Sequence, residues 1–84
     1  MYYLYLLRCS DNSLYCGQTK DLQRRINEHN GDNSKSKYTR SRRPVKLIYF
    51  EKYRTISKAL KREFEIKKMS KAKKEMLAKK NNSL

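Results

Sequence analysis

The sequence has no long apolar run. None approaches the ~18 residues that a membrane-spanning helix needs, so we do not expect a transmembrane protein. The apolar stretch at residues 2–7 is short and rich in tyrosine, and Arg8 follows it at once. This pattern does not predict a signal peptide. We therefore expect a cytoplasmic protein with no membrane partner.

Cysteine is scarce as well. Cys9 and Cys16 are the only two, they do not form a Cys-x-x-Cys pair, and no second pair could complete a zinc site. The pattern predicts two free thiols in a reducing compartment.

Acidic residues are few: 8 Asp and Glu stand against 22 Lys and Arg, for a formal net charge of +14. Such an excess supplies the counterion-release affinity of proteins that bind a phosphate backbone. We expect nucleic acid as the partner, DNA rather than RNA, with a recruiting protein as a further partner and a monomer as the oligomeric state. Charge alone leaves open an over-basic soluble domain or a ribosome-associated protein.

The length of 84 residues leaves room for one domain with a modest core. We expect that domain at residues 1–78, followed by a basic tail at residues 79–84 that frays.

The first half of the chain predicts a hairpin and a helix. Residues 1–9 are apolar and aromatic and predict a buried strand, residues 10–13 have turn chemistry, and residues 14–17 predict a returning strand. Asp21 is suited to cap a helix that stops at Asn30-Gly31.

The second half predicts a basic loop at residues 31–44 and a third strand at residues 45–53. A second helix should begin near Thr55 or Ser57, and Ser70 can cap a third. The expected fold is α+β: a small antiparallel three-stranded sheet flanked by helices, in the order strand, strand, helix, strand, helix, helix.

Glu63 is the acidic residue with the least ordinary position. It lies within the predicted inner stripe of the second helix, which comprises Ile56, Ala59, Leu60, Phe64 and Lys67. A carboxylate among apolar neighbours is normally paired or bound to metal. Helix periodicity alone favours an ion pair with Arg25 or a nearby Lys over a metal ligand.

Arg25 and His29 are spaced i,i+4 and fall on the same predicted stripe as Leu22. An Arg there can clamp a phosphate, and a His can transfer a proton near neutral pH. The alternative is a helix-edge Arg, whose stem packs while its head reaches water, beside a half-buried His.

Seven tyrosines lie mostly in the predicted strands, where packing is the expected role of most of them. Aromatic residues among basic ones also suit nucleic-acid binding. The candidate nucleic-acid-binding residues lie in the basic loop and are Lys35, Lys37, Tyr38, Arg40, Arg42 and Arg43.

Several short motifs occur in a specific order. They are Tyr3-Leu4-Tyr5, then Leu14-Tyr15-Cys16-Gly17, then Thr19-Lys-Asp-Leu-Gln-Arg-Arg25-Ile-Asn-Glu-His29, and then Glu63. Each motif alone is weak. In this order and spacing the sequence resembles the GIY-YIG nuclease superfamily, and in particular its small stand-alone members, from Tyr3 to about Leu77.

The resemblance implies a role for each matching residue. Tyr5 would help to activate the attacking water, and Tyr15 would line the site and orient the phosphate or water. Arg25 would stabilise the developing negative charge, and His29 would assist proton transfer or position Tyr5. Glu63 would hold one Mg²⁺ or Mn²⁺, which usually needs only one or two carboxylates beside substrate phosphates.

The chain departs from the family pattern at three positions. Tyr3 stands where the first triplet usually has glycine, and Cys16 occupies the middle of the second triplet. Glu75 falls near the position where many relatives carry an Asn that supports the site.

Tyr5 and Tyr15 can share a site only if their side chains emerge on one face of the hairpin. A two-residue loop at Asp11-Asn12 would place them on opposite faces, because side chains alternate along a strand. An odd-numbered loop, or a bulge near Ser13, would bring them to one face. The turn residues are compatible with both arrangements.

The expected function is that of a divalent-metal-dependent endonuclease that hydrolyses nucleic-acid phosphodiester bonds. A catalytically weak module on the same fold, binding DNA or structured or ribosomal RNA, is the main alternative. A ribosome- or RNA-associated structural protein is a third.

Overall fold

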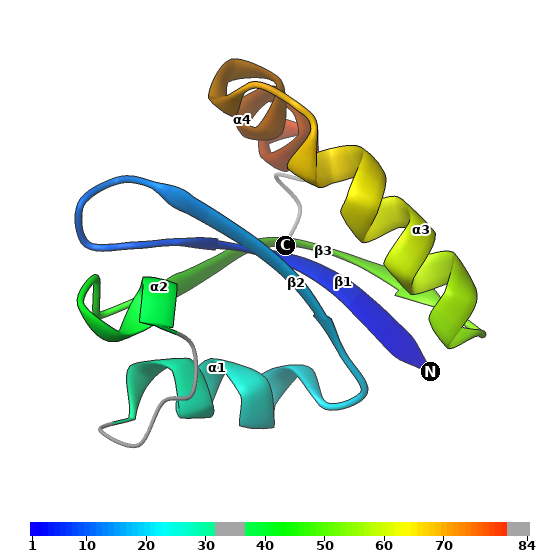
Figure 1. The fold of residues 1–84 in the computed structure, drawn as a ribbon, viewed down its shortest axis with the longest axis horizontal. Coiled ribbons are helices and arrows are strands. Elements are labelled where there is room, and N and C mark those ends of the chain that lie inside the picture. Colours follow the sequence, from blue (N-terminus) through cyan, green and yellow to red (C-terminus); the bar gives the residue numbers. More distant parts are fainter. Residues whose placement is uncertain (32–36, 81–84) are drawn as a thin grey trace.

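The expected α+β architecture is confirmed in a computed structural model, which describes residues 1–31 and 37–80 (Figure 1). The elements are β1 (Tyr2–Arg8), β2 (Leu14–Thr19), α1 (Leu22–Asn30), α2 (Lys37–Arg40), β3 (Lys46–Tyr53), α3 (Ile56–Lys67) and α4 (Lys71–Lys79). The short helix α2 lies where the sequence predicted only a basic loop. Of the predicted frayed tail, Lys79 is the last residue of α4 and Lys80 is its C-cap, while residues 81–84 lie outside the described part of the chain.

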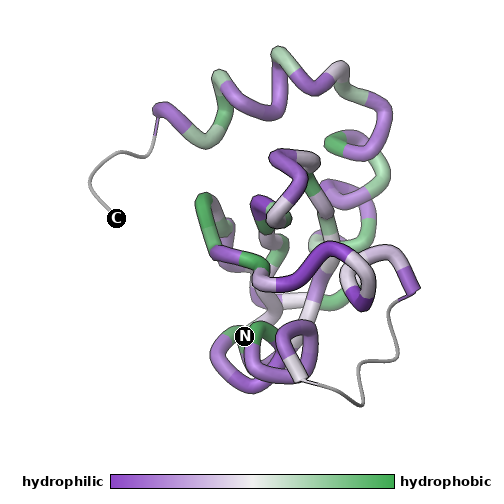
Figure 2. Tube along the Cα trace, turned by 90° about the vertical axis from the view of Figure 1, so that its left-hand side faces the viewer, coloured by the Kyte–Doolittle hydropathy of each residue, from purple (hydrophilic) through white to green (hydrophobic). Residues whose placement is uncertain are grey.

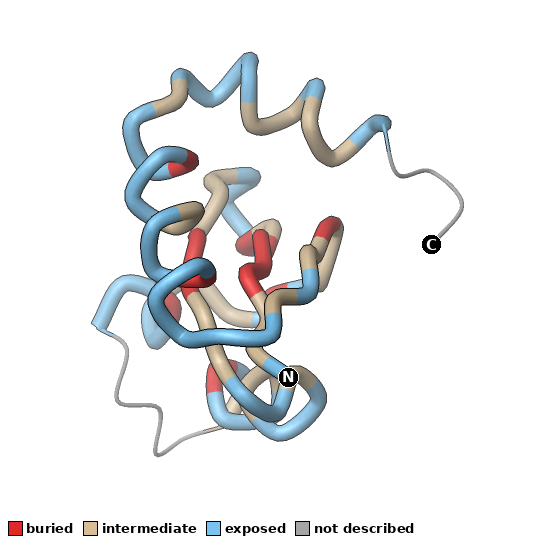
Figure 3. Tube along the Cα trace, turned by 90° about the vertical axis from the view of Figure 1, so that its right-hand side faces the viewer, coloured by how far each residue is buried: buried red, intermediate tan, exposed pale blue. Residues whose placement is uncertain are grey.

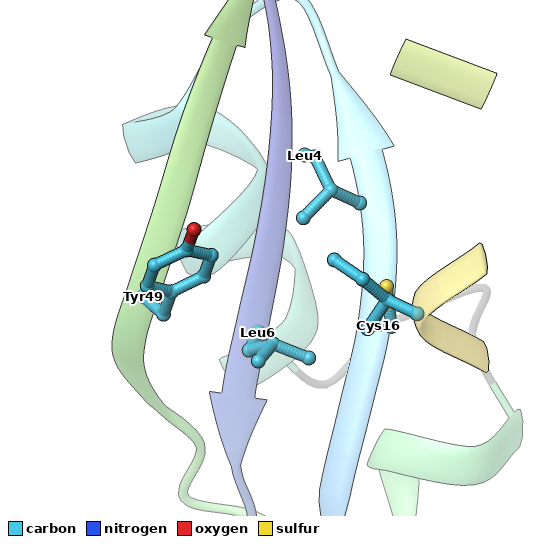
Figure 4. Close-up of a cluster of buried hydrophobic side chains, with 5 residues drawn as sticks. Leu4, Leu6, Cys16 and Tyr49 are labelled. Carbon is cyan, nitrogen blue, oxygen red and sulfur yellow. The ribbon is translucent and has the colours of Figure 1, made fainter. Parts of the chain in front are cut away.

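Strand β1 is the centre of an antiparallel sheet with the order β2-β1-β3. Its continuous apolar sequence is explained by helices on both faces: α1 lies on one side of the sheet, and α3 and α4 lie on the other (Figure 1). Leu4 and Leu6 pack on the α3 side with Cys16, Tyr49 and Ile66 (Figure 4). The α1-side cluster consists of Tyr5, Leu7, Cys9 and Val45, with Leu22 and Ile26 of α1 packed against it.

The β1–β2 hairpin has an odd-numbered loop. Cys9 and Ser13 are joined by a backbone hydrogen bond of 2.9 Å, which leaves residues 10–12 as the loop, and Asn12 adopts a positive φ of 70°. A three-residue loop of this kind ends in a left-handed residue. The register therefore pairs Leu7 with Tyr15 and Tyr5 with Gly17. This parity places Tyr5 and Tyr15 on the same face.

Each helix longer than one turn begins at a side chain that caps its first backbone amides. Asp21 accepts from the amide of Arg24 at 3.1 Å, and Ser70 accepts from that of Lys73 at 3.2 Å. Thr55, rather than Ser57, caps α3 by accepting from the amide of Lys58 at 3.3 Å. These caps follow from local sequence, and their prediction is confirmed.

The predicted inner face of α3 is confirmed at Ala59 and wrong at its other three apolar residues. Ala59 and Ile66 are buried, whereas Ile56, Leu60 and Phe64 are 46%, 43% and 63% exposed. Figure 3 shows exposed residues along most of α3 and α4, with buried positions where a helix turns toward the sheet. The small side chain of Ala59 allows a close approach to the sheet. An ion pair between Arg62 of α3 and Glu51 of β3 holds the helix in this orientation.

That ion pair joins β3 to α3. Glu51 accepts from Arg62 Nε at 3.0 Å and from the hydroxyls of Tyr49 and Tyr53. Although burial raises the pKa of Glu51, the hydrogen bonds from Arg62, Tyr49 and Tyr53 outweigh it and lower the pKa below its ordinary value.

A second ion pair joins α4 to β1. Glu75 accepts from Arg8 at 2.8 Å and 2.5 Å through its two carboxylate oxygens. Figure 2 shows hydrophilic residues throughout the helices. Among the described residues, no helix is long and apolar enough to cross a membrane.

Candidate active site

A chain of hydrogen bonds connects β1, α1 and α2 on the α1 face of the sheet. The hydroxyl of Tyr5 lies 3.0 Å from Nε2 of His29, and Nδ1 of His29 lies 2.8 Å from Oγ1 of Thr39. All three side chains are fully or almost fully buried. His29 lies on the same stripe of α1 as Leu22 and Ile26, which pack against the α1-side cluster, so it is turned toward the sheet.

Tyr15 closes the site on the β2 side. Its ring centroid lies 5.1 Å from that of His29 and 6.4 Å from that of Tyr5, so the three rings form one aromatic cluster. Tyr38 of α2 extends the cluster, with its centroid 5.7 Å from that of Tyr15. The parity of the hairpin loop is what allows these contacts.

Arg25 supplies positive charge beside this cluster. Its side chain is 33% exposed and pairs with Glu28 at 3.2 Å. Burial raises the pKa of Tyr5 to about 12, although the neighbouring Arg25 opposes that shift. Tyr5 therefore keeps its proton at neutral pH and needs a base to release it.

His29 is the base within reach of Tyr5. Burial, followed by the positive charge of Arg25, lowers the pKa of His29 below its ordinary value. The imidazole is therefore neutral at neutral pH and has one lone pair with which to accept a proton.

Glu63 belongs to α3, which lies on the other side of the sheet from α1 (Figure 1). Its side chain is 18% exposed and pairs with Lys67 Nζ at 3.3 Å, which is one of the two arrangements that the sequence left open. Burial raises the pKa of Cys16 to about 12, and the charge of Glu63 is the next contribution. The pKa of Tyr5 is raised chiefly by burial, and the charges of Tyr15 and Glu63 add to that shift.

A cavity of about 500 Å³ lies at the edge of β2 and is lined by residues of both helical layers. Arg24, Arg25 and Glu28 line it from α1, and Ile56 lines it from α3. Glu63 lies seven residues after Ile56, which places it on the same side of the helix. Arg25 lines this cavity, whereas Glu63 is not among the residues that line it.

The metal-binding side chains near the site suit a hard divalent cation only in part. Among residues 1–31 and 37–80 no cluster of three or more His, Cys, Asp or Glu could enclose a metal ion. A single carboxylate is nevertheless compatible with Mg²⁺, which keeps several waters and takes other ligands from substrate phosphates. Glu63 could hold such an ion once its contact with Lys67 is released.

The predicted nucleic-acid-binding residues fall into two groups. Lys37, Tyr38 and Arg40 of α2 are exposed. Arg42 pairs with Asp11 at 3.0 Å and lies over the Tyr38 ring at 4.1 Å, while Arg43 donates to the carbonyl of Arg40 at 3.0 Å. These last two arginines hold the segment in place. Lys35 lies outside the described residues.

The sequence did not reveal Thr39, and no pattern could have done so. Glu75, considered as a replacement for a supporting Asn, is held by Arg8 of β1. Arg8 alternates with Tyr5 along β1, so its side chain points to the opposite face of the sheet. Glu75 is therefore a structural partner of the strand rather than a neighbour of Tyr5.

Comparison with known proteins decides the family. The model of the GIY-YIG catalytic domain matches residues 1–76. The chain belongs to the GIY-YIG family. It is similar to small GIY-YIG proteins called UPF0213 proteins: that of Syntrophus aciditrophicus is 51% identical over 79 residues, which cover 94% of this chain and 91% of that protein. A relative from Staphylococcus saprophyticus is 51% identical over 73 residues, or 87% and 88% of the two chains.

A solved structure supports the same GIY-YIG assignment. The solution NMR structure of a UPF0213 protein from Bacillus halodurans superposes with a TM-score of 0.62 at 38% sequence identity. The match covers 96% of this chain and 86% of that one. The GIY-YIG fold therefore accounts for the sheet and for its helical layers.

Proposed function

We propose that this GIY-YIG protein hydrolyses phosphodiester bonds of nucleic acid with the help of Mg²⁺ or Mn²⁺. The observation that carries the proposal is the hydrogen bond between buried Tyr5 and neutral His29, beside Arg25 and a cavity at the β2 edge. This arrangement places a proton donor, Tyr5, next to a base, His29, and next to the positive charge of Arg25. Those are the groups that water attack on a phosphodiester requires.

In the proposed reaction, Tyr5 takes a proton from the attacking water as its own hydroxyl proton passes to Nε2 of His29. The water oxygen then bonds to phosphorus as the bond from phosphorus to the leaving oxygen breaks. The leaving oxygen takes a proton from solvent, and His29 releases the proton it received. Arg25 stabilises the charge that develops on the phosphoryl oxygens, and Tyr15 orients the phosphate. A divalent cation held by Glu63 would supply Lewis-acid stabilisation of the same charge.

Cleavage of supercoiled plasmid and of single-stranded DNA and RNA, with Mg²⁺ or Mn²⁺ and with EDTA, tests this proposal. Glu63→Gln should abolish cleavage while the protein stays folded. Glu65→Gln is the matched control, because Glu65 lies on the same helix with its side chain 52% exposed. Cleavage by Glu63→Gln at the parental rate, or cleavage that persists in EDTA, would rule out the metal role.

A binding module without efficient catalysis is the second candidate. Two observations favour it: the formal charge of +14, and the pairing of Glu63 with Lys67 instead of an open carboxylate. Salt-sensitive binding to nucleic acid, with no metal-dependent cleavage of any duplex, branched or single-stranded substrate, would identify this function.

A further inference from the structure

The α2 helix contributes one side chain to the interior. Thr39 is 0% exposed, whereas its neighbours Lys37 and Arg40 are exposed. Its Oγ1 lies 2.8 Å from Nδ1 of His29, on the side of the imidazole opposite to Tyr5. A hydroxyl can donate or accept, so the distances alone permit two tautomers of His29.

The hydrogen-bond requirements of Tyr5 select one of them. Tyr5 is 1% exposed, and the acceptor within reach of its hydroxyl proton is Nε2 of His29 at 3.0 Å. The guanidinium of Arg25 beside it has only donors. If Nε2 of His29 also carried a proton, the Tyr5 hydroxyl would face donors on both sides, and its own proton would lack an acceptor.

Buried donors without acceptors are rare in folded proteins. Among the described residues, no buried side-chain polar atom lacks a hydrogen-bond partner. Tyr5 must therefore donate to Nε2, which leaves the proton of the neutral imidazole on Nδ1. Nδ1 then donates to Thr39 Oγ1.

We infer that Thr39 is a positioning residue that holds His29 in the Nδ1–H tautomer, so that the Nε2 lone pair faces Tyr5. The catalytic part of this inference rests on the proposed function, in which Nε2 receives the Tyr5 proton. The short helix α2 would then have two roles. Lys37 and Arg40 are exposed and would face the nucleic acid, whereas Thr39 is buried and contacts His29.

His29 is the only histidine in the chain, so its ring nitrogens can be observed without ambiguity. Long-range ¹H–¹⁵N NMR spectra of the full-length protein near pH 7.5 report the tautomer directly. We expect protonated Nδ1 and unprotonated Nε2 in the parental protein and in Thr39→Ser, which keeps the hydroxyl. Thr39→Val keeps the shape of the side chain but removes the acceptor, and should shift His29 toward Nε2–H.

Steady-state kinetics separate positioning from binding. Thr39→Val should lower kcat by roughly tenfold or more with little change in KM, because the base now presents a proton to Tyr5. Thr39→Ser should restore kcat. Lys37→Gln, on the same helix, should instead act mainly by raising KM.

Two results would overturn the inference: Nε2–H in the parental protein, or a Thr39→Val protein with an unchanged tautomer. If Thr39→Val does not fold, the parental and Thr39→Ser spectra still decide the tautomer. If the parental protein cleaves no substrate, the proposed function fails, and the NMR spectra still decide whether Thr39 orients His29.

Discussion

Gly17 lies so close to Tyr5 that a Cβ atom at position 17 would be 2.6 Å from the Tyr5 hydroxyl oxygen and 2.8 Å from Cζ. The register of the hairpin places the two residues opposite each other on β2 and β1. Tyr5 is buried among core residues and cannot move aside freely. The glycine of the second family triplet thus makes room for the Tyr5 hydroxyl.

Replacing Gly17 with Ala should displace Tyr5 from His29. We expect the free energy of unfolding to fall by about 1–3 kcal/mol, as for other overpacked sites, and cleavage to fall with it. Gly31→Ala is the control, because a Cβ atom there would meet the nearest atom, the carbonyl oxygen of Asn27, at 3.4 Å. Urea unfolding and a cleavage assay measure both effects. A Gly17→Ala protein as stable and active as its parent would contradict the close approach.

The rate of cleavage should depend on the protonation of His29. Its lowered pKa predicts that the rate rises with pH at values below 6.5 and levels off near neutrality. Tyr5 should add no further change until strongly alkaline pH, because its pKa is about 12. Single-turnover rates between pH 5 and pH 9 at saturating enzyme test this profile. The other titratable groups around His29 are Tyr5, Tyr15, Arg25 and Glu28. A rate that keeps rising steadily to pH 9 would exclude His29 as the base.

The stability of the fold should depend on Glu51. Glu51→Gln breaks the pair with Arg62, and we expect a loss of about 2 kcal/mol, less than for a fully buried pair because the two side chains are 16% and 27% exposed. Glu65→Gln, which loses a more exposed contact to the same Arg62, should change stability by less than about 1 kcal/mol.

The effect of Glu51 should also depend on pH. The pKa of Glu51 is lower in the folded state than in the unfolded state, so its contribution is present above the ordinary pKa of 4.5. The contribution is lost as pH falls through the lowered value. Urea unfolding of the parent and of Glu51→Gln should therefore give stabilities that converge in acid. Equal stabilities at pH 7 would show that the pair contributes nothing.

Binding to nucleic acid should weaken steeply as salt rises, by orders of magnitude if several phosphates are contacted. Lys37→Gln should reduce the slope of log affinity against log salt by about 1, as expected for the loss of one phosphate contact. Lys71→Gln on α4 is the control, because α4 lies on the other face of the sheet (Figure 1). Fluorescence anisotropy with a labelled oligonucleotide measures the slope. An affinity that does not change with NaCl would mean that the basic surface has another use.

Several features of this protein were determined by the sequence alone, because each depends on neighbours along the chain. The caps Asp21, Thr55 and Ser70 act on amides three residues away, and the apolar residues of β1 predict a buried strand in any context. The net charge is a property of composition. The motif from Tyr3 to Glu63 identified the family, because the order of residues can be read without knowing their positions in space.

Tertiary structure alone decided which residues meet. The hairpin parity depends on whether Asn12 adopts a left-handed conformation, and Asp11 and Asn12 suit more than one turn. The buried face of α3 follows from Ala59 and from Arg62, whose partner Glu51 lies 11 residues earlier on another element. Thr39 reaches His29 across 10 residues of chain. Contacts of this kind have no local period or cap that could reveal them, because they arise only when separate elements pack around β1.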